Sequence, residues 1–92
     1  MPSPHLVEVL QYVAAHVKAL RARRGLTQEG LAEVAEIDLR FLQKIETGKT
    51  NLSLDVLLRL SAALQVKPGV LLRKTAFMKP RRGRPPKRKV PR

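Results

Sequence analysis

Hydrophobic residues recur at helical spacing along the first part of the chain. The stripe advances by alternating steps of four and three residues: Leu6, Leu10, Val13, Val17 and Leu20. This spacing predicts one long amphipathic helix, because such steps keep side chains on a single helix face. Ser3 is suited to cap that helix and Pro4 to occupy its first position. Gly25 is expected to end it.

Two short helices are predicted next, separated by about three residues. Thr27 is a suitable N-cap for the first of them, whose buried side is expected to consist of Leu31, Ala32, Val34 and Ala35. Asp38 is a suitable N-cap for the second, which is expected to run to about Thr47 before Gly48 stops it. Two short helices joined by a tight turn are typical of a helix-turn-helix.

Two further helices complete the pattern. Ser53 caps a strongly apolar segment that is expected to lie at the centre of the core, with Leu54, Leu57, Leu58, Leu60, Ala63 and Leu64. Lys67 and Pro68 begin a last short helix that carries Val70, Leu71 and Leu72. The pattern shows no strand alternation, so the predicted fold class is all-α with five helices and short connections.

The segment 36–48 has a polar side that hydrophobic packing does not explain. Phe41, Leu42 and Ile45 form its apolar side, while Arg40, Gln43, Lys44 and Thr47 fall opposite. Most polar helix faces only meet water. The pattern alone leaves open whether this face is solvated or binds a partner.

Composition narrows the classes of function. A chain of 92 residues without cysteine has room for one small core, and it has no disulfide framework, zinc-thiolate site or thiol nucleophile. No apolar run is long enough to span a membrane, and no secretory signal is recognisable. His5 and His16 stand in no ligand or nucleophile motif and are expected on the surface. We therefore expect an intracellular, cytoplasmic protein that is not an enzyme and has no metal or cofactor.

Charge divides the chain into two parts. The net charge is +12, with 19 basic and seven acidic residues. Residues 79–92 hold eight of the basic residues and no acid, so residues 1–78 carry eleven basic and all seven acidic residues, a net +4. The tail is rich in proline and has almost no apolar residue, so we expect it to be disordered. The predicted division is a folded domain at 1–78 and a basic tail at 79–92, with a polyanionic partner.

Several short motifs in order resemble one known family. They are Arg21, GLTQE at 25–29, LA at 31–32, Ile37-Asp38, IETGK at 45–49, Ser53-Leu54 and the closing LQV and LL. Together the motifs of residues 14–73 resemble the Xre-type, lambda-repressor-like helix-turn-helix domain. The resemblance implies a five-helix fold, double-stranded DNA as the partner, and transcription regulation as the function.

The resemblance also implies a role for the polar face of the third helix. In this family that helix enters the major groove, and the matching positions are Leu39, Arg40 and Lys44, with Gln43 beside them. Arginine can donate two hydrogen bonds to guanine, lysine can donate to guanine or meet a phosphate, and leucine can touch a thymine methyl group. The alternative for Leu39 is that it only borders the core.

Other positions match the family's contacts to the DNA backbone. They are Thr27, Gln28, Thr47, Lys49, Thr50 and Asn51. Such contacts set the register on DNA without reading its sequence. The alternative for each is a plain capping or loop role. Arg21 and Glu46 match a structural ion pair between the first and third helices.

The sequence departs from the family at two turns. The family usually has glycine where this chain has Glu36, and often where it has Gln65. If these positions need a positive φ, each side chain with a β-carbon costs roughly 1 kcal/mol.

The tail contains Arg82, Gly83, Arg84 and Pro85, a sequence that resembles an AT-hook. Glycine lets the backbone lie deep in a narrow minor groove, and the arginines point into the negative potential of A·T tracts. The alternatives are a nonspecific electrostatic arm or a nuclear-import-like signal.

Members of this family usually bind paired half-sites as homodimers. Candidate interface residues are Leu57, Leu58, Val70, Leu71 and Leu72, or Val9 and Tyr12 on the first helix; the alternative is that all of them fill the core. No small-molecule effector is evident. Two other functions stay open: an antitoxin that also binds a protein partner, and an architectural chromosome-binding protein associated with the nucleoid.

Overall fold

The computed structural model describes residues 3–75. Its elements, in chain order, are α1 (Pro4–Arg23), α2 (Gln28–Ala35), α3 (Leu39–Ile45), α4 (Leu54–Ala63) and α5 (Pro68–Leu72). The prediction of an all-α fold with five helices is therefore confirmed for the described residues. In this part of the chain no helix is both long enough and apolar enough to cross a membrane.

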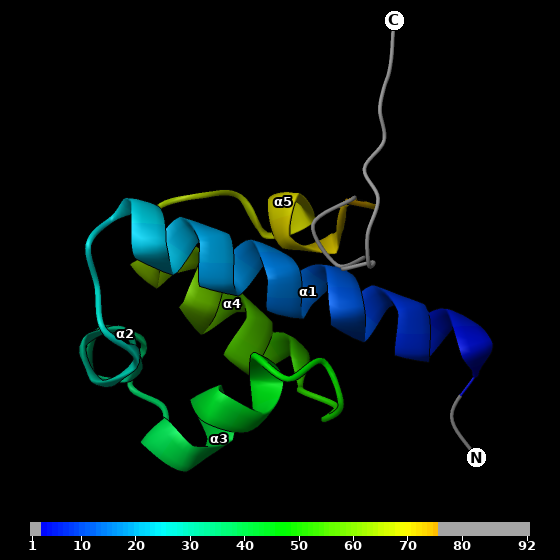
Figure 1. Ribbon diagram of the computed structural model, residues 1–92, viewed down its shortest axis with the longest axis horizontal. Coiled ribbons are helices and arrows are strands. Elements are labelled where there is room, and N and C mark those ends of the chain that lie inside the picture. The colour runs from blue at the N-terminus through cyan, green and yellow to red at the C-terminus, as the bar shows by residue number, and fades with distance from the viewer. Residues whose placement is uncertain (1–2, 76–92) are drawn as a thin grey trace, which may run out of the picture.

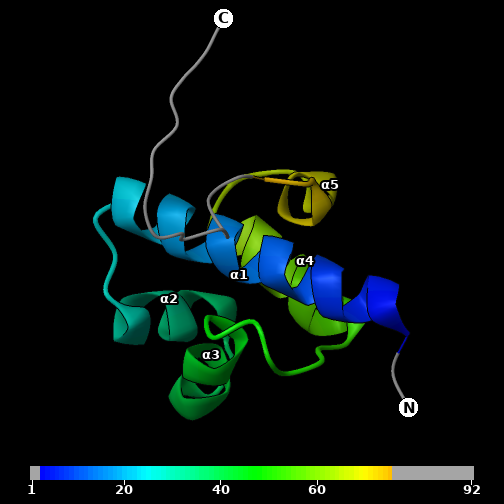
Figure 2. The ribbon, with the colours of Figure 1, turned by 45° about the vertical axis from the view of Figure 1, so that its right-hand side comes forward.

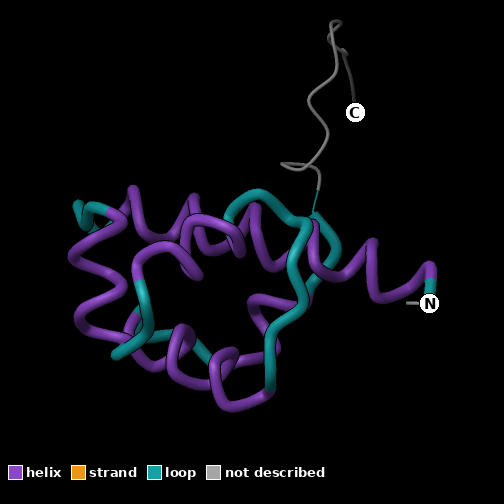
Figure 3. Tube along the Cα trace, turned by 90° about the horizontal axis from the view of Figure 1, so that it is seen from below, coloured by secondary structure: helices purple, strands orange, loops and turns teal. Residues whose placement is uncertain are grey.

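The long helix α1 runs along the whole molecule, with α2 and α3 on one side of it and α5 on the other (Figures 1 and 2). The helix α4 lies in the middle, where it packs against α2 and α5. The first turns of α1 project beyond the other helices, as the view from below also shows (Figure 3). This projection leaves the N-terminal part of α1 packed on fewer neighbours than the rest.

All five helices begin at the residues that the sequence indicated, and four of them are capped by a side chain. Each capping side chain accepts a hydrogen bond from the backbone N–H three residues later, which satisfies a donor that the helix itself leaves unpaired. The bonds join Leu6 to Ser3 at 3.0 Å, Gly30 to Thr27 at 2.9 Å, Phe41 to Asp38 at 3.2 Å, and Val56 to Ser53 at 3.1 Å. The third helix ends two residues before the predicted Thr47, because the chain already turns there toward Gly48, whose φ is +77°.

Aliphatic residues from every helix fill the core. Those fully enclosed are Val13, Val17, Leu31, Leu42, Ile45, Leu60, Leu64 and Leu71. Three predicted core residues are exposed instead: Val34 by 59%, Leu54 by 75% and Leu58 by 51%. The core-facing stripe of α4 runs through Leu57, Leu60 and Leu64, and Leu58 is turned about 100° away from it.

Tyr12 and Val9 do not offer the open surface that an interface on the middle of α1 would need. Tyr12 is buried, and its hydroxyl donates a 2.6 Å hydrogen bond to Glu8 Oε2. This hydrogen bond, together with the neighbouring carboxylate charge, raises the pKa of Tyr12. Val9 packs against the core. Likewise, His16 is not a free surface residue: its Nε2 lies 3.0 Å from the carbonyl oxygen of Arg73, which ties α1 to the chain after α5.

Both turns that lack the family's glycine adopt a left-handed backbone. Glu36 has a φ of 58° and Gln65 a φ of 60°. In this region the β-carbon of an L-residue crowds its own backbone, which costs roughly 1 kcal/mol. The packing on either side of each turn therefore keeps Glu36 and Gln65 in a backbone conformation that is locally unfavourable.

We expect Glu36→Gly to raise the free energy of unfolding by about 1 kcal/mol, because glycine occupies this conformation without strain. Chemical denaturation followed by circular dichroism measures the change. Glu33→Gly is the matched control: Glu33 is an exposed residue inside α2, so the same substitution there should cost about 1 kcal/mol. Equal destabilisation by the two variants would contradict the strain at Glu36.

Candidate nucleic-acid interface

The turn between α2 and α3 is short and is held by two backbone hydrogen bonds. The N–H of Glu36 donates to the carbonyl of Glu33 at 3.2 Å, and the N–H of Ile37 donates to that of Ala32 at 3.0 Å. This pair of bonds around a left-handed residue is a Schellman motif, which ends a helix sharply. Asp38 then caps α3, so three residues set the angle between the two helices.

The polar face of α3 points to solvent. Arg40, Gln43 and Lys44 are exposed, whereas Leu42 and Ile45 on the opposite side are fully buried. Leu39 lies between the two sides: it is partly buried and packs against the core. The helix therefore directs two cations and an amide toward solvent, while its opposite side is packed in the core.

A buried carboxylate lies directly behind this face. The side chain of Glu46 is only 4% exposed, and Glu46 is the one buried charged residue among residues 3–75. Arg21 donates to it twice, from Nε to Oε2 at 2.8 Å and from Nη2 to Oε1 at 3.1 Å. Gln28 Nε2 adds a third hydrogen bond, to Oε1 at 2.9 Å. Such bidentate, charge-assisted bonding satisfies a carboxylate that burial alone would destabilise.

The same cluster joins three helices at one point. Arg21 also donates from Nη1 to the carbonyl of Leu26 at 3.1 Å, which fixes the chain between α1 and α2. Gln28, at the start of α2, accepts a 3.4 Å hydrogen bond from Gln43 Nε2 on α3. The end of α1, the start of α2 and the polar face of α3 are thus held in one hydrogen-bonded network.

The residues that match the family's backbone contacts lie on two sides of α3. Thr27 and Gln28 are at the start of α2, where the side chain of Gln28 is already bonded to Glu46. The others follow α3: Thr47 donates to the carbonyl of Lys44 and accepts from the N–H of Lys49. Asn51 accepts from the N–H of Leu52 at 2.8 Å, Lys49 is exposed and Thr50 is half-buried. Capping and turn roles are therefore present at most of these positions.

One contributor to the turn was missed by sequence reasoning. Arg59 on α4 bonds Asp55 at 2.9 Å, and its Nη1 lies 3.4 Å from both the carbonyl and the carboxylate of Glu36. The spacing of four residues between Asp55 and Arg59 is visible in the sequence. The approach to Glu36 is not, because it depends on how α2 packs against α4. The predicted tail residues Arg82, Gly83, Arg84 and Pro85 lie outside the described residues.

A tight turn between two short helices, with a solvated cationic face on the second, defines a helix-turn-helix DNA-binding domain. A family model described as Helix-turn-helix matches residues 17–71. The chain belongs to this helix-turn-helix family of DNA-binding regulators. The first three turns of α1 and the basic tail lie outside the matched segment.

Two of the solved structures that are similar to this chain support this assignment of the fold. The restriction-modification controller protein C.AhdI from Aeromonas hydrophila is 34% identical with a TM-score of 0.65, over 67% of this chain and 94% of that one. The hypothetical transcription factor NHTF from Neisseria is 26% identical with a TM-score of 0.69, over 71% of this chain and 73% of that one. No match was found among curated protein sequences.

We expect Arg21→Gln to lower the free energy of unfolding by about 3 kcal/mol, because it leaves the Glu46 carboxylate buried without its cation. The double variant Arg21→Gln with Glu46→Gln should recover part of that loss, since no charge then remains buried. Denaturant unfolding of both variants gives the comparison. Arg23→Gln, at an exposed position two residues on, is the control and should change stability by no more than about 0.5 kcal/mol. A double variant less stable than Arg21→Gln would refute this account of the pair.

Proposed function

We propose that this protein is a sequence-specific transcription regulator that inserts α3 into the major groove of double-stranded DNA. The observation that carries the proposal is the orientation of α3. Arg40, Gln43 and Lys44 project outward together, while the other side of the helix is buried. A major groove about 12 Å wide admits a helix with such a face.

The exposed side chains suit recognition of base edges. Arg40 can donate two hydrogen bonds to the O6 and N7 of guanine, and Gln43 can pair in the same way with adenine. Lys44 can donate to guanine or to a phosphate. Leu39 is left with the part of its surface that faces away from the core, which suits contact with a thymine methyl group. The bond from Gln43 to Gln28 would hold one of these groups in position before DNA arrives.

Contacts to the DNA backbone would flank α3 on both sides. On one side lie Thr27 and Gln28, at a helix N-terminus whose backbone N–H groups favour anions. Because the side chain of Gln28 is bonded to Glu46, we assign its phosphate contact to the backbone rather than to the amide group. On the other side Thr47, Lys49, Thr50 and Asn51 follow α3. These contacts would fix the register of α3 along the groove.

The proposal includes two further contacts with DNA, one through a second copy of the domain and one through the basic tail. Two-fold related half-sites would be bound by a homodimer, as is usual for helix-turn-helix proteins. Residues 82–85 would enter an adjoining A·T-rich minor groove. A tail linked to the domain would then strengthen binding by holding a second contact at high local concentration. The similar structures, one titled a controller protein and one a hypothetical transcription factor, support regulation as the function.

Selection of bound fragments from random DNA would identify the preferred site. We then expect Arg40→Ala to weaken binding to that site by about 1–3 kcal/mol and to relax the preference at one position, because a base contact is lost. Lys49→Ala should instead weaken binding to all sequences alike. Fluorescence anisotropy with competitor DNA measures both effects. Lys67→Ala is the control, because Lys67 directly precedes α5, which lies on the other side of α1 from α3 (Figure 1). If Arg40→Ala kept the sequence preference of the wild type, the proposal that Arg40 on α3 recognises a base would be wrong.

We expect removal of residues 79–92 to weaken DNA binding and to flatten its salt dependence, since each phosphate neutralised adds about 0.9 to the slope of log K against log salt. Titrations at several salt concentrations measure the slope. The double variant Arg82→Lys with Arg84→Lys keeps the charge but should lose the preference for A·T flanks. An unchanged slope after truncation would show that the tail does not contact DNA.

A further inference from the structure

The buried carboxylate of Glu46 fixes the direction of its hydrogen bond to Gln28. A carboxylate carries no hydrogen, so it can only accept. The side chain of Glu46 is 4% exposed and already accepts two hydrogen bonds from Arg21. The group of Gln28 that lies 2.9 Å from Glu46 Oε1 must therefore be the amide nitrogen. The amide oxygen of Gln28 is then free to accept a hydrogen bond from another residue.

The oxygen of Gln28 in turn fixes the direction of the next contact. An amide oxygen only accepts, so the group of Gln43 that faces it must be a nitrogen. Gln43 Nε2 lies 3.4 Å from Gln28 Oε1, a long distance for such a bond. The contact therefore adds little stability, but it determines which end of the Gln43 amide group faces the protein. The opposite orientation would bring two oxygen atoms together.

This orientation defines what Gln43 offers to a partner. Gln43 is exposed on the same face of α3 as Arg40. With its nitrogen directed at Gln28, it presents Oε1 and its second N–H to the outside. In the major groove adenine offers the donor N6–H beside the acceptor N7, whereas guanine offers two acceptors, O6 and N7. A Gln43 side chain held in this way is complementary to adenine and places its oxygen against an acceptor of guanine.

We propose that Glu46, acting through Gln28, fixes the orientation of the Gln43 amide group and thereby makes Gln43 selective for adenine over guanine. Gln28 is a positioning residue in this arrangement, because it acts on the base through Gln43. The side chain of Gln28 was expected at a phosphate, but both ends of its amide group are engaged within the protein. The inference rests on the proposed function, in which α3 enters the major groove, and it names the base that Gln43 recognises.

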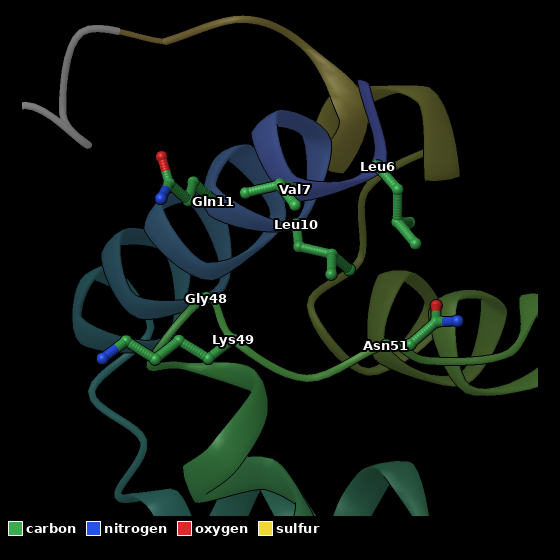
Figure 4. Close-up of a pocket in the computed structure, with 7 residues that line it drawn as sticks. All are labelled: Leu6, Val7, Leu10, Gln11, Gly48, Lys49 and Asn51. Carbon is green, nitrogen blue, oxygen red and sulfur yellow. The ribbon is translucent and has the colours of Figure 1, made fainter. Parts of the chain in front are cut away.

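A second exposed glutamine provides a matched control. Gln11 on α1 lines an open hollow beside the loop after α3, where Gly48 and Lys49 also contribute to the lining (Figure 4). The amide group of Gln11 points away from this loop (Figure 4). Neither Gln28 nor Gln43 lines the hollow. Gln11 therefore shows how a glutamine behaves when Glu46 does not orient it.

The free protein tests the orientation without DNA. NMR relaxation of the side-chain amide groups, measured on the full-length chain, reports how rigidly each glutamine is held. We expect the Gln43 amide group to be more rigid than that of Gln11, and to become as mobile as Gln11 in Gln28→Met, because methionine has no amide oxygen to accept its hydrogen bond. Gln11→Met should leave Gln43 rigid. A Gln43 amide group as mobile as that of Gln11 in the wild type overturns the proposal.

Binding to DNA tests the selectivity. The preferred site is prepared with adenine, guanine or purine, which lacks the N6 amino group, at the base pair where Gln43→Ala relaxes the preference. We expect the wild type to bind adenine roughly tenfold or more tightly than guanine or purine. Gln28→Met should bring the ratio of adenine to guanine near one and keep the preference at the base pair that Arg40 recognises. Gln11→Met should keep both preferences.

The outcomes distinguish this inference from the proposed function. A wild type without preference at any base pair overturns the proposed function, and the assignment of adenine with it. A wild type that keeps the preference due to Arg40 but binds adenine and guanine alike overturns this inference alone, as does a Gln43→Ala variant that relaxes no base pair. Equal loss of both preferences in Gln28→Met would show that Gln28 only supports the packing of α3, and it also overturns the inference. Thermal unfolding checks that Gln28→Met is folded, and the wild-type measurements do not depend on it.

Discussion

The arrangement of this domain depends on one buried carboxylate. Glu46 lies at the end of α3, out of contact with water, and its stability there requires the guanidinium of Arg21 and the amide of Gln28. Because these partners come from the end of α1 and the start of α2, satisfying one charge fixes three helix ends at once. The outward direction of Arg40 and Lys44 follows from that fixed geometry. The cluster acts on DNA recognition by positioning α3, and its own atoms face the interior.

The turn before α3 contains a residue with a strained backbone that the surrounding packing holds in place. Glu36 adopts a left-handed conformation that glycine would occupy more easily, and so does Gln65 after α4. The N–H groups of Glu36 and Ile37 both donate to carbonyls of α2, and Arg59 of α4 approaches the carbonyl and the carboxylate of Glu36. The packing of α2 on α4 therefore sets the conformation of the turn. A helix-turn-helix can thus tolerate an unfavourable residue at its sharpest bend when the neighbouring helix supports it.

The candidate site was only partly accessible from the sequence. The face with Arg40, Gln43 and Lys44 could be predicted because helical periodicity places these residues opposite Leu42 and Ile45. The bond between Gln28 and Gln43 could not, since these residues are fifteen positions apart and meet only when α2 and α3 are packed. Val34, Leu54 and Leu58 were predicted to lie in the core, but they are exposed. The sequence shows that a residue is apolar, but not whether another part of the chain covers it.

The sequence by itself determined the number and class of the elements. Their starts were also readable from it, because a capping side chain bonds a backbone group only three residues away, and such short-range interactions can be recognised along the chain. Tertiary structure alone decided which apolar residues are covered, where α1 meets the loop after α3, and how Arg59 reaches Glu36. Each of these depends on segments far apart in the sequence, whose distance is set by the packing of the whole core.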